Sequence, residues 1–284
     1  MAEKTTVQSW KKQNRRSLIY KYIVLIIIFL IIVIPIVMLI FGALKTRGEL
    51  ATMPYTPPIP PHFENIQKIL NQPDFWNMLK NSLFVMLVVT AGTVLVAAMA
   101  AFAFSRLNFR GKSLSFNLVT LGLLFPMSIA ILPEYILLRQ LNLLNLWGII
   151  LPEIAFALAG DILILRGFFM AIPVELQDAA YIDGCSNLGF FWKILLPLAR
   201  PSLSAVAVLA MINSWNELFL PIVILNDEKL YTLPLGTMQF STEHGTDWAM
   251  VLAFVALSMI PTIIFYLFAE KQLISGLTAG AVKG

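Results

Sequence analysis

Long runs of apolar residues decide what this chain can fold into. A helix needs about 20 mostly apolar residues to cross a bilayer, and six stretches of the sequence meet that requirement. With 58% hydrophobic and only 13% charged residues, the chain could not hide these stretches in one water-soluble core. We therefore expect an all-α, polytopic integral membrane protein with six transmembrane helices. The stretches lie at roughly 18–44, 81–105, 114–136, 148–170, 202–225 and 248–269.

The first apolar stretch could be mistaken for a secretory signal peptide, because basic residues precede it. The apolar region of a signal peptide is 7–15 residues long and ends at a small-residue cleavage site. Residues 18–44 form a much longer run, and no such site follows them. We therefore expect an uncleaved first transmembrane helix. The basic residues before it include Lys11, Lys12, Arg15 and Arg16.

Lysine and arginine are distributed unevenly over the loops that six spans would create. Cytoplasmic loops of membrane proteins carry an excess of these residues. If the N-terminus is cytoplasmic, most of the 20 Lys and Arg residues fall in inner segments. Both termini are therefore expected in the cytoplasm, and the net charge of +4 reflects topology rather than a nucleic-acid partner. The outer loops would hold only Lys45, Arg47, Lys68, Lys80, Arg139 and Lys229.

The segments between the spans differ in composition. The first outer loop is rich in proline, which excludes a regular helix and favours an extended backbone, although residues 63–72 suit a short surface helix. Asn81 and Ser82 open the second span, whose alanines and Gly92 predict a close packing face. The expected parts are a cytoplasmic tail 1–17, a first span 18–44, an extracytoplasmic loop 45–80, a five-helix region 81–270 with a cytoplasmic loop at 171–201, and a cytoplasmic tail 271–284.

The polar segment that begins at Pro173 predicts two short helices joined by a bend. Proline suits a first helical turn because its missing N–H would be unpaired there, and Glu175 is favourable at the positive end of the helix dipole. Gly184 suits the residue after the helix, where φ is positive. Ser186 can cap a second helix that Pro197 ends. The apolar docking face of this second helix would consist of Phe190, Phe191, Ile194 and Leu195.

This segment resembles the EAA loop of ABC-importer permeases, whose pattern is Glu-Ala-Ala, three residues, Gly, nine residues, Ile, any residue, Leu-Pro. The spacing agrees from Asp178 to Pro197, with Asp178 in place of Glu. The resemblance implies that the loop docks in a groove of an ATPase subunit, and the two alanines leave a low surface for that docking. The residues implied in ATPase coupling are Glu175, Asp178, Ala179, Ala180, Asp183, Gly184, Ile194, Leu196 and Pro197.

The whole chain resembles the second, maltose-permease-like membrane subunit of carbohydrate importers, which has the type I (MetI-like) permease core. Residues 101–106 with 109–111, residues 214–217 and the tail 276–284 carry this resemblance. It implies a homologous permease partner, two ATPase subunits that bind the ATP, an extracytoplasmic solute-binding protein and a mono- or oligosaccharide or polyol substrate. It also implies a bacterial or archaeal cell membrane. The tail would either reach the ATPase interface or fray, and its implied contacts are Gly276, Leu277, Thr278, Gly280 and Lys283.

Three carboxylates fall within or near the predicted spans. Such groups cost about 2.5–3.5 kcal/mol on insertion scales, so they usually face a polar cavity or a partner. Glu153 is expected at the outer interface, whereas Asp161 lies deep in the fourth span, where a cavity-facing and a structural role stay equally open. Glu217 in the fifth span is the third.

The surroundings of Glu217 suit a sugar path. The aromatic face of Trp215 could stack on a sugar ring, and the amides of Asn213 and Asn216 could bond its hydroxyls. Consecutive helical residues diverge by about 100°, so Asn213 can share a face with either Asn216 or Glu217 but not with both. The alternative, that these polar groups only bond neighbouring helices, stays open. The possible substrate path thus comprises Asp161, Asn213, Trp215, Asn216 and Glu217.

No arrangement in the sequence indicates an enzyme, a metal site or a resident cofactor. The chain has one cysteine, Cys185, and two histidines on outer loops, and it shows no nucleophile with a base. Gly111-Lys112-Ser113 resembles the end of a phosphate-binding loop, but Arg106 stands where the first glycine is needed. A secondary transporter or channel without an ATPase is the alternative function. It would leave 173–201 unexplained, and no internal repeat supports it.

Overall fold

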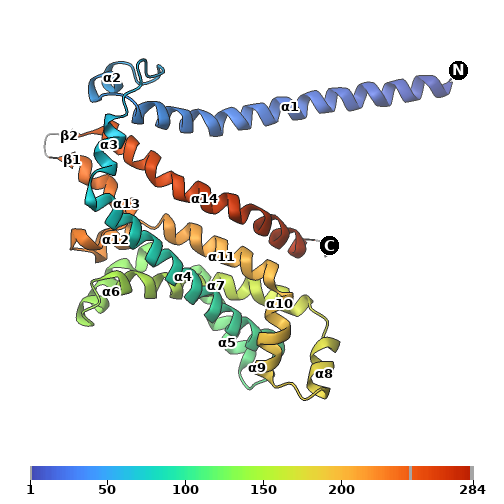
Figure 1. The fold of residues 1–284 in the computed structure, drawn as a ribbon. Helices are drawn as coiled ribbons and strands as arrows, with labels where there is room; N and C mark the ends of the chain where they lie inside the picture. Colours follow the sequence, from blue (N-terminus) through green and yellow to red (C-terminus); the bar gives the residue numbers. More distant parts are fainter. Residues whose placement is uncertain (1, 243–244, 282–284) are drawn as a thin grey trace. The chain divides into compact units, whose positions relative to one another are not determined.

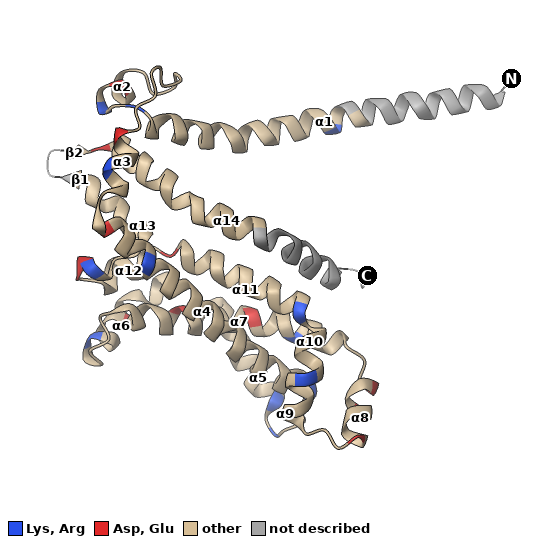
Figure 2. Ribbon diagram, viewed as in Figure 1, with Lys and Arg blue, Asp and Glu red and all other residues tan. Residues whose placement is uncertain are grey.

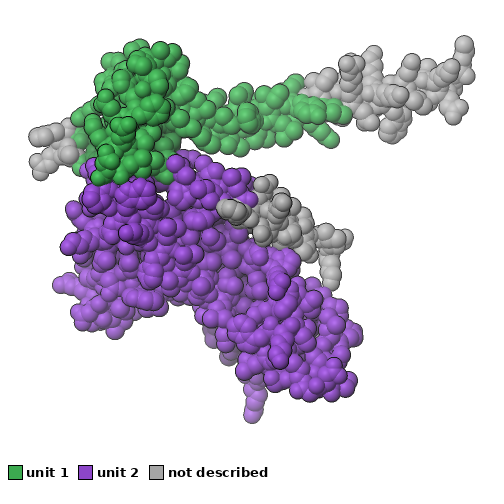
Figure 3. Space-filling view, viewed as in Figure 1, with its two compact units in different colours: residues 1–71, 240–257 green, residues 72–239, 258–284 purple. Residues whose placement is uncertain are grey.

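The structure, a computed structural model, describes the backbone of residues 2–242 and 245–281 and the side chains of residues 18, 20–241 and 245–267. Nearly all of this chain is helical (Figure 1), which confirms the all-α prediction. The strands described are the two-residue β1 (Ser241–Thr242) and β2 (Gly245–Thr246), which pair antiparallel. The chain divides into two compact units (Figure 3), residues 1–71 with 240–257 and residues 72–239 with 258–284.

Within the described residues, four helices are long and apolar enough to cross a membrane. Two bent helix pairs would bring the number to six if each pair is one span. Figure 2 shows that charged residues gather mostly in turns and at helix ends. The four long candidates are Tyr20–Ala43 in α1 (Ala2–Ala43), α4 (Pro73–Arg106), α7 (Leu146–Ala171) and Trp248–Leu267 in α14 (Trp248–Ala281).

The loop that the sequence predicts to be an outer loop belongs to the first unit and is folded around Lys45. This side chain is only 2% exposed, and its ammonium donates hydrogen bonds to the carbonyl oxygens of Met53 at 2.6 Å and Pro54 at 3.2 Å. A buried charge is tolerated where such acceptors surround it. The proline-rich segment is therefore fastened to the end of α1 by one buried cation.

Two short helices interrupt this outer loop. The expected surface helix is confirmed as α3 (Glu64–Leu70), whereas α2 (Arg47–Thr52) was not expected from the sequence. Its signal was present: Thr46 and Glu49 form a reciprocal capping box. The hydrogen bonds from Thr46, followed by the nearby His62, lower the pKa of the Glu49 carboxyl.

In the second unit, α4 begins at Pro73 rather than at the expected 81, because proline opens the helix and Asp74 lies in its first turn. Asn81 and Ser82 therefore do not open the helix but hold a later loop against its side. The Asn81 amide donates to the Tyr231 carbonyl at 3.0 Å, and the Leu233 N–H donates to the Ser82 hydroxyl at 2.8 Å. That loop contains η3 (Glu228–Leu230), α13 (Leu233–Gly236) and η4 (Thr237–Phe240).

The predicted third span is sharply bent. The pair formed by α5 (Lys112–Leu121) with η1 (Gly122–Leu124) meets α6 (Met127–Gln140) at 101°. Pro126 caps α6 in an extended conformation, and a proline cannot supply the N–H that a continuous helix needs. The predicted stretch 114–136 is therefore not one straight helix, although the bent pair together is long and apolar enough for one span.

The predicted fifth span, 202–225, is also not one helix. α11 (Arg200–Trp215) ends at Trp215, and α12 (Phe219–Ile224) follows after a break. Polar side chains satisfy the backbone at this break: the Asn216 amide donates to the Ile212 carbonyl at 2.7 Å. The Leu220 N–H donates to the Glu217 carboxylate at 3.0 Å. On its other side, α11 meets the preceding helical segment 187–198 at 79°.

Small residues bring α4 and α7 close together, which confirms the predicted packing face. A β-carbon at Gly92 would lie 2.6 Å from Cδ1 of Ile154 in α7. Ala97, Ala98 and Ala101 are buried along the same helix. Without a hydrophobic drive between helices in lipid, such close backbone approach is what favours association.

Gly148 at the start of α7 allows a second close approach, between this helix and the loop that precedes it. Its β-carbon would lie 2.0 Å from the Leu143 carbonyl oxygen, a backbone atom that cannot move aside cheaply. Gly148→Ala should therefore destabilise the protein by about 1–3 kcal/mol and lower its thermal unfolding midpoint in detergent. Gly160→Ala on the same helix is the matched control, because its β-carbon would make an ordinary 3.6 Å contact with Leu123. An equal loss in both variants would contradict the packing argument.

Candidate functional site: coupling loop and membrane pocket

The predicted bend between two short helices is confirmed. α8 (Glu175–Ile182) ends in a left-handed Gly184 with φ of 80°. The Gly184 N–H donates to the Tyr181 carbonyl at 3.0 Å, and the Cys185 N–H donates to the Ala180 carbonyl at 2.9 Å. This paired closure is the Schellman helix end, which favours glycine at that position. We call residues 173–201 the coupling loop.

The second half of the coupling loop begins where Ser186 accepts a hydrogen bond from the Gly189 N–H at 3.1 Å. A helical turn, α9 (Asn187–Phe190), continues through a π-helical turn, η2 (Phe191–Leu195), into α10 (Leu196–Leu198). The capping serine is confirmed. The π-helical turn was not expected and widens the backbone at this point.

The apolar face of this second half is not free for docking. Phe190, Phe191 and Leu195 are buried in the chain's own core, where the ring of Phe191 lies 5.2 Å from that of Phe102 in α4. Ile194 and Leu196 are partly buried against the same cluster, and Ala180 is itself buried there. The expectation that these residues form an open docking face is therefore wrong. Glu175, Asp178, Ala179, Asp183, Gly184 and Pro197 are exposed.

Arg106 at the end of α4 connects the ends of α4 and α7 with α8. Its guanidinium donates to the carbonyl oxygens of Phe169 and Ile172 at the end of α7, where backbone acceptors lack helical partners. Arg106 also lines a polar pocket of about 660 Å³ together with Gln177 and Asp178 of α8. From the sequence, Arg106 was noted only because it replaces the first glycine of a phosphate-binding loop and because it ends a motif shared with the carbohydrate permeases. Its bonds to the end of α7 were not predicted.

Within α8, a chain of side-chain hydrogen bonds reaches the second half of the coupling loop. The buried Gln177 amide donates to the Tyr181 hydroxyl at 2.8 Å, and that hydroxyl donates to the side-chain oxygen Oδ1 of Asn187. The two halves of the loop are therefore joined on the side that faces Arg106.

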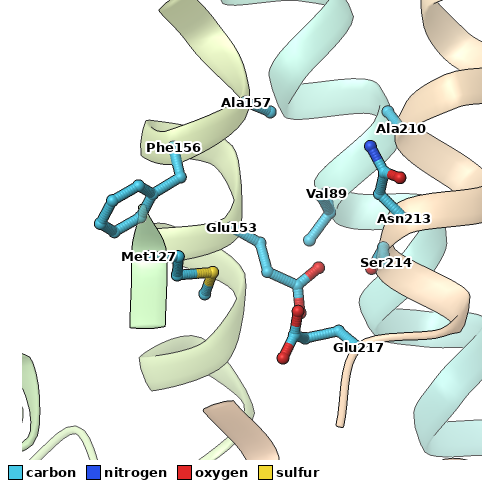
Figure 4. Close-up of a pocket in the computed structure, with 9 residues that line it drawn as sticks. All are labelled: Val89, Met127, Glu153, Phe156, Ala157, Ala210, Asn213, Ser214 and Glu217. Carbon is cyan, nitrogen blue, oxygen red and sulfur yellow. The ribbon is translucent and has the colours of Figure 1, made fainter. Parts of the chain in front are cut away.

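A second pocket, of about 220 Å³, lies among α4, α6, α7 and α11 (Figure 4). We call it the membrane pocket. Its polar groups come from α7 and from the end of α11, and its apolar groups from all four helices. The lining residues are Val89, Met127, Glu153, Phe156, Ala157, Ala210, Asn213, Ser214 and Glu217.

Glu153 lies inside this pocket. Its side chain is 9% exposed, and neither carboxylate oxygen has a partner with full hydrogen-bond geometry in the described chain, although Ser214 is close enough to interact with it. The Ser214 hydroxyl, which lines the same pocket, also has no partner with hydrogen-bond geometry. The rotation of α7 turns Glu153 inward against α11, whereas its expected depth at the outer interface stays a prediction.

The residues predicted for a substrate path separate into two groups. Asn213 and Glu217 line the membrane pocket, and Figure 4 shows the Glu217 carboxylate turned toward that of Glu153. Asn216 instead bonds the end of its own helix. Asp161 is buried but is not among the residues that line this pocket.

The ring of Trp215 does not line this pocket. It is buried and contacts Phe265 edge-to-face at 5.5 Å, because two residues along a helix turn the side chain by about 200° from Asn213. Phe156 supplies the aromatic ring of the membrane pocket instead. Only the contact between α7 and α11 places Phe156 there, so no local sequence pattern could have indicated it.

The tail residues expected at the ATPase interface lie outside the side chains that the structure describes. These are Gly276, Leu277, Thr278, Gly280 and Lys283. Among the described residues, no group of three or more His, Cys, Asp or Glu side chains could hold a metal ion.

Comparisons with known proteins agree with this fold. Residues 92–273 match the family described as "Binding-protein-dependent transport system inner membrane component". Over 211 residues, 74% of this chain and 75% of the relative, the chain is 36% identical to the arabinooligosaccharides transport system permease protein AraQ of Halalkalibacterium halodurans. It is 33% identical over 266 residues, 93% of each chain, to the sulfoquinovosyl glycerol transport system permease protein SmoH of Agrobacterium fabrum.

A solved structure shares the fold. It is a crystal structure of a bacterial ABC transporter involved in the import of the acidic polysaccharide alginate, with a TM-score of 0.80 at 23% identity over 91% of this chain and 97% of that one. The family match covers well over half of the chain, and the relatives align along most of their lengths. This chain therefore belongs to the family of inner membrane components of binding-protein-dependent transport systems.

Proposed function

We propose that this membrane transport subunit is the permease of an ABC importer for carbohydrates. It would form the translocation path with a homologous permease, receive substrate from an extracytoplasmic binding protein and be driven by two ATPase subunits. The observation that carries the proposal is the coupling loop, whose Gly184 bend and exposed acidic α8 match the EAA pattern. The names of the relatives AraQ and SmoH support a sugar-containing substrate.

Affinity purification from native membranes tests this assignment. A tag at the N-terminus spares the tail, and mass spectrometry identifies the proteins that accompany the chain. An ATPase, a second permease and a solute-binding protein should be recovered, and the ligand of the binding protein would name the substrate. Purification of the chain alone, with solute movement driven by an ion gradient without ATP, would establish the secondary-transporter alternative instead.

We also propose that the tail contacts the ATPase pair. The same purification from a chain lacking 276–284 provides the test. Membrane insertion should be retained, and less ATPase should be recovered. Unchanged recovery and unchanged stimulation of ATP hydrolysis would remove the tail from the coupling contacts.

Cys185 allows a direct test of the proposed orientation, with both termini and the coupling loop in the cytoplasm. It is the only cysteine in the chain, and it is partly exposed beside Gly184 in the coupling loop. A membrane-impermeant maleimide should label the purified chain from inside-out vesicles and not from intact cells or spheroplasts. Added ATPase subunits should slow the labelling. Labelling from intact cells would place the loop outside and contradict the topology; Cys185→Ser is the control for specificity.

A further inference from the structure

The membrane pocket contains polar groups whose hydrogen-bonding capacity is unmet. The Glu153 carboxylate is nine-tenths buried, and no group of the described chain bonds it with full hydrogen-bond geometry, although the Ser214 hydroxyl lies close enough to interact with it. The neighbouring Ser214 hydroxyl is also buried without a partner that has full hydrogen-bond geometry. Buried polar atoms without partners are rare because each one loses its hydration without compensation. A ligand that donates hydrogen bonds would satisfy these groups.

The pocket carries carboxyl groups without a compensating cation. Glu153 and Glu217 both line it, and its nine lining residues include no lysine or arginine. One oxygen of Glu217 already accepts the Leu220 N–H, while Figure 4 shows its carboxyl group close to that of Glu153. The wall therefore presents carboxyl oxygens and no cationic side chain. An anionic ligand would find no counter-ion there.

The remaining lining suits the apolar face of a sugar ring. Phe156 and Met127 lie on the side of the pocket opposite Asn213 in Figure 4, so a ring entering between them would meet apolar groups on one face and amide or carboxyl groups at its edge. The volume of about 220 Å³ is below the roughly 300–1,000 Å³ of sites that enclose drug-sized ligands. The pocket therefore fits one sugar unit rather than a whole oligosaccharide.

We propose that the membrane pocket binds one neutral sugar unit, with Glu153 and Glu217 accepting hydrogen bonds from its hydroxyls, and that it discriminates against anionic sugars. This proposal rests on the proposed function as a carbohydrate importer. The proposal favours a substrate like that of the relative AraQ over one like that of SmoH. Arabinooligosaccharides are neutral, whereas sulfoquinovosyl glycerol carries a sulfonate.

Direct binding to the purified importer in nanodiscs, without binding protein, tests the proposal. The probes are arabinotriose and maltotriose as neutral sugars, and sulfoquinovosyl glycerol and trigalacturonate as anionic ones, with saturation-transfer NMR as the readout. The neutral sugars should bind at least about tenfold more tightly than the anionic ones. Glu153→Gln should weaken neutral-sugar binding about tenfold. In the double variant with Glu217→Gln, the ratio of the affinities for neutral and anionic sugars should also fall.

Glu134→Gln is the matched control, since Glu134 lies in α6 and is not among the residues lining the membrane pocket. Its binding should equal that of the unmodified importer. Equal or tighter binding of the anionic sugars, no binding of either neutral sugar, or identical effects of Glu153→Gln and Glu134→Gln would overturn the proposal. So would a Na⁺ requirement for transport that Glu153→Gln removes, because the carboxylates would then hold a cation. Failure of the importer assignment is recognised separately, by the absence of ATP-driven sugar uptake.

Discussion

Gly184→Val should reduce ATP-driven uptake at least tenfold without preventing membrane insertion. Gly184 has φ of 80°, and a β-carbon there would meet no atom within 4 Å. The penalty is therefore purely one of backbone conformation, about 1–2 kcal/mol for a left-handed residue and larger for a β-branched one. An energy of this size changes the population of the bend by roughly 5–30-fold. Valine would relieve the strain by changing the angle between α8 and α9.

Gly111 provides a close control for this substitution. It has φ of 81° and equally open surroundings, but it lies in the turn before α5. Gly111→Val should carry the same strain and retain most uptake, whereas Gly184→Asn should retain coupling because asparagine tolerates the left-handed region. Uptake and ATPase stimulation in proteoliposomes are the measurements. Equal loss at both glycines, or normal uptake by Gly184→Val, would show that the bend does not transmit the ATPase movement.

Arg106→Ala should lower both stability and coupling. The substitution removes the donor to the Phe169 and Ile172 carbonyls, and hydrogen bonds from a charged group contribute about 1.5–3 kcal/mol. It also removes the positive charge at the C-terminal end of α7, where the helix dipole favours one. Because Arg106 borders Gln177 and Asp178, α8 would lose its support on the membrane side. We expect a lower unfolding midpoint and a fall in uptake of about tenfold.

Arg110→Ala separates this role from a general loss of positive charge. Arg110 is exposed in the turn between α4 and α5, one helical turn beyond Arg106 in sequence. Its removal should leave both the unfolding midpoint and uptake within experimental error. If the two arginine variants behave alike, inner-side charge rather than the bond to α7 accounts for the effect.

The coupling loop could be predicted from the sequence because its signals are local. Gly184 and Ser186 each set the geometry within a few residues, so spacing along the chain was enough. The bends at Pro126 and after Trp215 were not predicted, because hydropathy reports whether a segment prefers lipid and not whether its axis is straight. Pro126 was visible as a possible breaker, but its effect depends on whether neighbouring groups satisfy the freed backbone.

The membrane pocket was only half predictable. Asn213 and Glu217 are four residues apart, so one face near the end of α11 could be inferred from helical periodicity. Trp215 was included in the predicted path because its chemistry suits a sugar, although helical periodicity separates it from the face of Asn213. Glu153 and Phe156 belong to α7, and only tertiary packing brings that helix against α11. No pattern within either segment predicts how α7 is rotated about its own axis, and therefore which of its side chains face α11.

The exposed side of α8 has a consequence for how the subunit is handled in the cell. Ile182 is 87% exposed and Leu176 is also exposed, beside the carboxylates of Asp178 and Asp183. Exposed apolar side chains of this kind are typical of a surface that binds another protein. A chain that lacks this partner is recognised by chaperones and proteases. We expect copies without an ATPase to be degraded faster than assembled ones, so the surface that we propose for ATPase docking would also keep the subunits in balanced numbers.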